Sequence, residues 1–118
     1  MKIQERATGG VIILDMDGPL ITESRGEVRL PDVVRNWLQQ GHRHFVLNLE
    51  RVPSVDTTGL CDIVQASVAT TRQNGTLKLL HLTPRVRQVL TITRLLTVFD
   101  VYDTEENAVA SFGPAAST

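Results

Sequence analysis

The sequence contains only one cysteine, few aromatic residues and no long apolar run. A single thiol cannot form an internal disulfide, which excludes a small scaffold held together by disulfides. The longest apolar run, residues 11–14, is far too short to cross a bilayer. The charged residues near the N-terminus also leave no apolar stretch for a signal peptide. We therefore expect a cytoplasmic protein with no membrane partner.

The sequence also lacks an excess of charge of either sign. Twelve basic and 13 acidic residues give a formal net charge of -1, whereas a nucleic-acid partner requires a clustered basic excess, so none is expected. The 118 residues fit one domain, and 42% hydrophobic residues suffice for one core. Because aromatics make up only 4%, that core must be aliphatic, which suits an α/β domain. We place the domain at residues 1–112 and a frayed tail at 113–118.

The hydrophobic pattern alternates between strands and helices along the chain. β-branched and alternating stretches predict strands at residues 2–6, 11–16, 45–49, 77–82 and 98–102. Helical spacing and capping residues predict helices that begin near residues 30, 56, 84 and 104. This order predicts a mixed, mostly parallel sheet that begins with an antiparallel pair, with helices packed mainly on one face.

Two helix starts carry specific capping signals. Thr83 followed by Pro84 predicts a hydroxyl cap with proline at the first helical position, and Asp103 or Thr104 should cap the last helix. In the second helix, spacing divides the residues between two faces. We expect Leu60, Ile63, Val64, Ser67 and Val68 to face the core, and Asp62, Gln65, Ala69, Arg72 and Gln73 to face outward.

The start of the second helix offers the clearest candidate chemistry. The strand at 45–49 leads through a short loop to Asp56, whose carboxylate can accept the free N–H groups of the first turn. Thr57 and Thr58 then lie in that turn, and Gly59 leaves room for a backbone or a partner to approach. A helix N-terminus favours an anion such as a phosphate. On spacing alone, however, a plain cap with two satisfied hydroxyls remains the stronger explanation.

Five stretches, in this order, resemble the STAS domain family, and within it the bacterial anti-sigma factor antagonists. They are the central strand at 46–49, the Val-Asp-Thr-Thr-Gly-Leu sequence at 55–60, Asn74-Gly75, the Leu-Thr-Pro-Arg-Val sequence at 82–86, and the segment at 95–108. The sequence departs from the family at two places. It has threonine where the family usually has serine at the acceptor, and residues 18–22 lack the aspartate often found there.

The resemblance implies regulation by partner switching. In that family the unmodified protein binds an anti-sigma factor, itself a serine/threonine kinase, and releases the sigma factor. The kinase phosphorylates the hydroxyl after the motif aspartate, which breaks the complex, and a phosphatase reverses the mark. The acceptor implied here is Thr57, with Thr58 as the alternative, and a weak homodimer remains open. The expected partner surface comprises Asp56, Thr57, Thr58, Gly59, Leu60, Cys61 and Asp62 on the helix, and Thr22, Glu23, Ser24 and Arg25 in the preceding loop.

Two alternatives belong to other classes of protein. Asp15 and Asp17 follow an apolar strand, as do the paired aspartates in the first motif of haloacid-dehalogenase-like phosphatases. The chain is short for that fold, and Lys78 precedes Thr83 rather than following it, so we expect a regulator without enzymatic activity, cofactor or metal. The second alternative is a structural STAS module whose complexes do not depend on phosphorylation.

Overall fold

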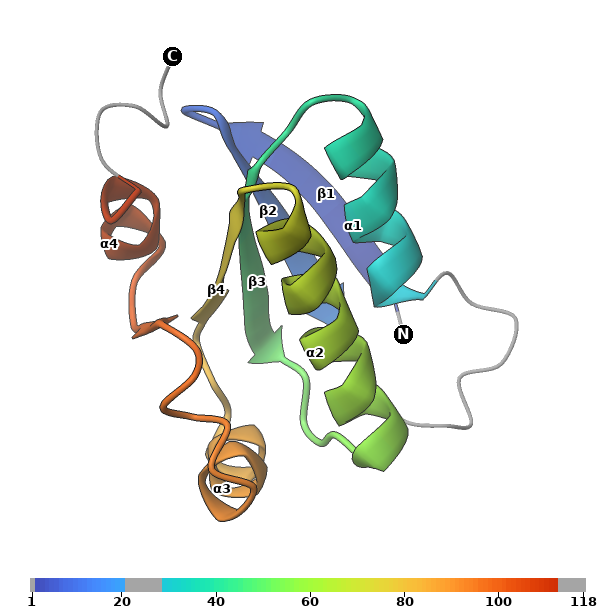
Figure 1. Ribbon diagram of the computed structural model, residues 1–118. Coiled ribbons are helices and arrows are strands. Elements are labelled where there is room, and N and C mark those ends of the chain that lie inside the picture. The colour runs from blue at the N-terminus through green and yellow to red at the C-terminus, as the bar shows by residue number, and fades with distance from the viewer. Residues whose placement is uncertain (1, 21–28, 113–118) are drawn as a thin grey trace.

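The computed structural model describes residues 2–20 and 29–112, which form a five-stranded sheet with four helices (Figure 1). The strands are β1 (Lys2–Thr8), β2 (Val11–Asp17), β3 (His44–Arg51), β4 (Thr76–Leu80) and β5 (Val101–Tyr102). They lie side by side in chain order, with β1 and β2 antiparallel and the remaining pairs parallel. The predicted mixed sheet with an initial antiparallel pair is confirmed.

Chain connectivity determines which face of the sheet each helix covers. The helices are α1 (Leu30–Gln39), α2 (Thr57–Arg72), α3 (Pro84–Ile92) and α4 (Glu105–Ala110). Each parallel strand is added on the same side of the preceding one, so right-handed crossovers place the connecting helices on one face. Helices α1 and α2 run next to each other over that face (Figure 1). Helix α4 follows the last strand and packs against the other face, so the helices lie mainly, but not all, on one side.

Strand β2 is buried on both faces of the sheet. Ile12, Leu14 and Met16 belong to the large core cluster beneath the connecting helices. The alternate residues Val11 and Ile13 belong to a smaller cluster that includes residues of α4. Burial on both faces explains why the strand reads as a continuous apolar run rather than an alternating one.

Within the described residues, no helix has the length and apolar character needed to cross a membrane.

The predictions for residues 98–100 and for the Thr83 hydroxyl are wrong. Residues 98–100 do not join the fifth strand, because the main-chain N–H of Val98 closes a turn onto Leu95 and the Val98 side chain is exposed. The Thr83 hydroxyl does not cap α3; it donates to the carbonyl of Val52 at 2.8 Å and ties the helix start to the end of β3. Thr104, by contrast, is the side-chain cap of α4, as predicted.

Candidate functional site

Asp56 fixes the beginning of α2 through two hydrogen bonds, one that it accepts and one that it donates. Its Oδ1 accepts the main-chain N–H of Gly59 at 2.9 Å, which is the predicted N-cap. Its own main-chain N–H donates to the carbonyl of Leu20 at 3.0 Å. The first turn of α2 is therefore joined to the segment that follows β2, and the exposed residues of that turn have a fixed position.

Gly59 is buried against a main-chain carbonyl. A β-carbon at this position would lie 2.1 Å from the carbonyl oxygen of Leu20, which is far inside van der Waals contact. Leu20 also forms an isolated parallel bridge with Val55, just before the helix. The glycine expected to allow a close approach is thus required by the chain's own backbone, because any side chain would separate α2 from this segment.

Thr57 and Thr58 lie in the first turn of α2, and both side chains are exposed. Cys61 is exposed one turn further along, while Leu60 is half-buried against the core. The N–H groups of this turn form the positive end of a 16-residue helix. An exposed hydroxyl at this place can be reached by another protein, and a phosphate on it would lie at the favourable end of the helix dipole.

Asp62 does not face solvent, in contrast to the prediction. The residue is only 9% exposed, and its Oδ1 accepts a hydrogen bond of 2.6 Å from Nη2 of Arg29. This hydrogen bond raises the pKa of Arg29 above its ordinary value. Sequence reasoning missed Arg29, because the pair spans 33 residues and no local spacing indicates it. Asp62 and Gly59 therefore hold the helix in position rather than forming exposed surface.

The loop residues Thr22, Glu23, Ser24 and Arg25 lie outside the described residues, so their predicted contact with a partner remains a prediction. The residues that bound this gap both contact the start of α2. Leu20 accepts the N–H of Asp56, and Arg29 pairs with Asp62. Leu20 and Arg29 therefore both lie beside the first two turns of α2.

The two aspartates of the phosphatase-like motif have different surroundings. The Asp15 carboxylate receives two hydrogen bonds from Arg6 and one of 2.8 Å from the Asn48 amide, and Arg6 also bonds Glu105. Burial alone would raise the pKa of Asp15, but the hydrogen bonds from Arg6 and Asn48 outweigh it, so the net pKa lies below the ordinary value. Asp17 is exposed beside Arg51. Among the described residues, no group of three or more acidic, His or Cys side chains could hold a metal.

The sequence matches the STAS domain family over residues 2–108. Since this match covers most of the chain, the chain belongs to the STAS domain family. This match confirms the family that the resemblance implied.

The chain is similar to several anti-sigma factor antagonists. It is 28% identical over 115 residues to a Bordetella bronchiseptica protein named as an anti-sigma factor antagonist, BtrV, and the match covers 98% of this chain and 97% of BtrV. An anti-sigma factor antagonist from Mycobacterium paratuberculosis has a TM-score of 0.79 at 16% identity, over 93% of this chain and 92% of that chain.

The anti-sigma factor antagonist SpoIIAA has been solved in two states that both resemble this fold. The unphosphorylated form has a TM-score of 0.70 at 18% identity, over 94% of this chain and 97% of that chain. The phosphorylated form, described as a Bacillus cell fate determinant, has a TM-score of 0.71 at 19% identity, over 94% and 99%. At these identities the likeness confirms the fold.

Proposed function

We propose that this protein is a cytoplasmic anti-sigma factor antagonist that works by partner switching. The unmodified form binds an anti-sigma factor, which is also a serine/threonine kinase, through the first turns of α2, and this binding releases the sigma factor. Phosphorylation of Thr57 breaks the complex, and a phosphatase restores it. The observation that carries the proposal is the exposed Thr57 at a helix start fixed by Asp56 and Gly59. The names of the similar proteins support it.

Charge explains how one phosphate could switch binding. A phosphate on threonine adds about 1.5 to 2 negative charges at neutral pH. In the free protein, water and the positive end of α2 would stabilise these charges. A partner that covers this helix start would have to remove the water from the dianion, and the cost can reach several kcal/mol when no cation compensates. The free state is therefore favoured after phosphorylation without any change of fold.

The neighbours on α2 favour Thr57 over Thr58 as the acceptor. In a helix, residues three and four positions apart lie next to each other. The residue four positions after Thr57 is Cys61, which is uncharged, whereas the residue four positions after Thr58 is Asp62. A phosphate on Thr58 would lie near the Asp62 carboxylate, and Arg29 is already paired with that carboxylate. Like-charge repulsion therefore disfavours Thr58.

The test is to recover binding partners from the native cytoplasm, purify the recovered kinase and incubate it with protein variants and ATP. Phosphate should be transferred to wild type and to Thr58→Ala, but not to Thr57→Ala, as mass spectrometry would show. Thr57→Ala should keep its affinity for the kinase, and Thr57→Glu should lose at least tenfold, or about 1.4 kcal/mol. Thr91→Glu, an exposed threonine on α3, controls for the added charge.

Two results would decide against parts of this proposal. Loss of phosphate transfer in Thr58→Ala, with transfer retained in Thr57→Ala, would move the acceptor to Thr58. Equal binding of the kinase by Thr57→Glu and Thr57→Ala would reject the switch. The alternative of a structural STAS module, which binds its partner regardless of charge at Thr57, would then hold.

A further inference from the structure

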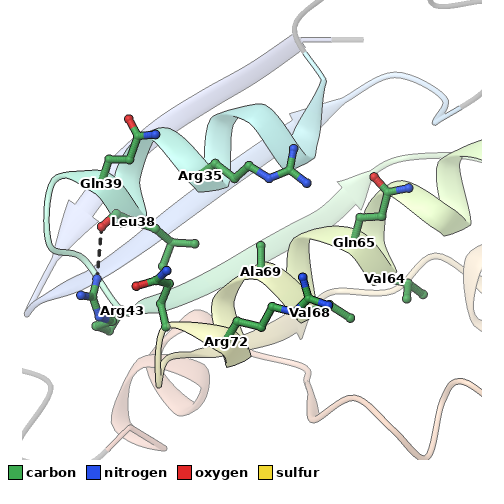
Figure 2. Close-up of a pocket in the computed structure, with 10 residues that line it drawn as sticks. Arg35, Leu38, Gln39, Arg43, Val64, Gln65, Val68, Ala69 and Arg72 are labelled. Carbon is green, nitrogen blue, oxygen red and sulfur yellow. Dashed lines mark hydrogen bonds between the residues drawn. The ribbon is translucent and has the colours of Figure 1, made fainter.

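A second surface lies at the other end of α2, in a groove between α1 and α2 (Figure 2). The groove has a volume of about 800 Å³. The residues that line it come from α1, from α2 and from the segments just after these helices. They include Arg35, Leu38, Arg43, Val68, Ala69 and Arg72. None of the residues proposed for the switch is among them.

The floor of the groove is aliphatic. Leu38 on α1 and Ala69 on α2 lie between the two helices in Figure 2, and both pack with the main core. Val68 is 43% exposed, although helical spacing assigned it to the core side. It is one of few large apolar side chains exposed on the described surface. A ligand that covered this floor would gain free energy by removing apolar area from water.

The rim of the groove is basic. Arg35 extends along α1, and Arg72 lies along α2 near Val68 (Figure 2). Arg43 is anchored, because its Nη1 donates to the carbonyls of Leu38 and His42 at 3.2 and 3.0 Å. Its remaining N–H groups are thus held in a fixed orientation, which reduces the entropy lost when a ligand binds.

Little negative charge compensates these three guanidinium groups. No acidic residue is among the described residues that line the groove. Arg35 has a distant partner in Asp32, with 3.6 Å between Nη1 and Oδ1 and both side chains more than half exposed. Arg72 forms no ion pair with any residue in the described part of the chain. Three positive charges therefore gather in one groove of a chain whose net charge is -1.

We propose that this groove binds an acidic protein segment that carries aliphatic side chains. Carboxylates would pair with Arg35, Arg43 and Arg72, and the aliphatic side chains would cover Val68 and the floor. A small inorganic anion would use the arginines but leave the apolar floor exposed. A nucleic acid would need a larger basic surface than three arginines provide. An acidic segment with apolar residues on one side matches both the floor and the rim.

The groove is separate from the proposed switch. Thr57 and Arg72 are 15 residues apart on one helix, which corresponds to about 22 Å at 1.5 Å per residue. For Arg72 this distance exceeds the screening length of about 8–10 Å at ordinary ionic strength, while Val64, the uncharged lining residue of α2 nearest to Thr57, lies about 10 Å from it along the helix. The two surfaces can therefore be occupied independently, and a phosphate on Thr57 should leave the groove's affinity unchanged.

The test uses a fluorescein-labelled peptide of about three helical turns, with leucines spaced three and four residues apart and glutamates beside them. Its twin has glutamine at each glutamate position. Fluorescence anisotropy at low salt should show saturable binding of the acidic peptide to wild type and at least tenfold weaker binding of the twin. Arg35→Gln/Arg72→Gln should also bind the acidic peptide at least tenfold more weakly.

The controls separate this groove from general attraction and from the switch. Arg85→Gln/Arg87→Gln removes two exposed arginines of α3 and should change the affinity less than twofold, and so should Thr57→Glu. Thermal unfolding of each variant checks that the fold is kept. Equal binding of both peptides, no saturable binding, or unchanged affinity in Arg35→Gln/Arg72→Gln would overturn the proposal. Displacement of the peptide by inorganic phosphate at equal concentration would also overturn it, because the groove would then be a phosphate site.

Discussion

The two ends of α2 are held in similar ways but present different surfaces. At each end a glycine lies close to a main-chain carbonyl of another segment. Gly59 lies against Leu20. Gly75 lies against Arg43, where an added β-carbon would be 2.3 Å from the carbonyl oxygen. The first end carries the exposed hydroxyls of Thr57 and Thr58, and the Asp62 carboxylate one turn further on is paired with Arg29. The last end carries Arg72 beside an open apolar groove. Similar anchoring with different exposed chemistry suggests that α2 serves as a rigid support for two separate contact surfaces.

The largest effect is expected from adding a methyl group at either anchored glycine. Gly59→Ala would force the Leu20 carbonyl away from α2 and break its hydrogen bond with Asp56, for a loss of about 2–3 kcal/mol in unfolding free energy. Gly75→Ala should lose a similar amount, since the Arg43 carbonyl accepts the N–H of Thr76. Urea denaturation measures both.

Binding distinguishes the two glycine variants. Below the unfolding transition, Gly59→Ala should weaken the complex with the kinase, because Leu20 and Asp56 position the first turn of α2. Gly75→Ala should leave that complex intact and instead weaken binding of the acidic peptide, because it displaces Arg43. If both variants affected the same ligand, the two ends of α2 would not be separate surfaces.

The next largest effect concerns the pair that joins α2 to the start of α1. Asp62→Ala should cost less than Gly59→Ala, because Asp62 is buried but Arg29 is more than half exposed and solvent screens the pair. Asp62→Asn keeps the shape and should cost less. Urea denaturation of the two variants gives the comparison. A stability equal to wild type in Asp62→Ala would show that the pair does not hold α2.

A smaller effect is expected from removing the cap. Asp56→Ala deletes the acceptor for the Gly59 N–H and should lower the unfolding free energy by about 1 kcal/mol. Asp56→Ser retains a capping oxygen and should recover most of that loss. Thermal unfolding monitored by circular dichroism is the measurement, and failure of serine to recover stability would assign the loss to another contact of Asp56.

The smallest effect should come from the last turn of α2. Arg72 lies at the negative end of the helix dipole, so Arg72→Gln should cost only about 0.3 kcal/mol in unfolding free energy. Arg72→Lys, which keeps the positive charge, should be neutral. A loss above about 1 kcal/mol in Arg72→Gln would mean that the arginine stabilises the fold, and the contribution of the groove's arginines to peptide binding would then be measured in Arg35→Gln, which leaves Arg72 in place.

Local signals in the sequence predicted most of the fold. The apolar runs of β2, β3 and β4 and the caps Asp56 and Thr104 were identified because each depends on neighbouring residues. The end of α2 was also identified. Asn74 adopts a positive φ of 62°, and the N–H groups of Asn74 and Gly75 close the helix onto Thr71 and Thr70.

The errors arose where distant segments meet. The outward assignment of Asp62 failed because Arg29, just before α1, pairs with it, and the inward assignment of Val68 failed because α1 leaves a groove there. The Thr83 cap failed because the carbonyl of Val52 competes for its hydroxyl. Contacts of this kind depend on how elements pack, and a sequence pattern within one helix does not contain that information. The sequence did not indicate for the same reason that Arg35, Arg43 and Arg72 line one groove.

The glycine contacts at both ends also fix the number of residues that α2 can contain. Each inserted or deleted residue would rotate one end of the helix by about 100° and shift it by about 1.5 Å. Gly59 could then remain against Leu20, or Gly75 against Arg43, but not both. Insertions within residues 57–72 should therefore be among the least tolerated in the described part of the chain, even where they fall at exposed positions.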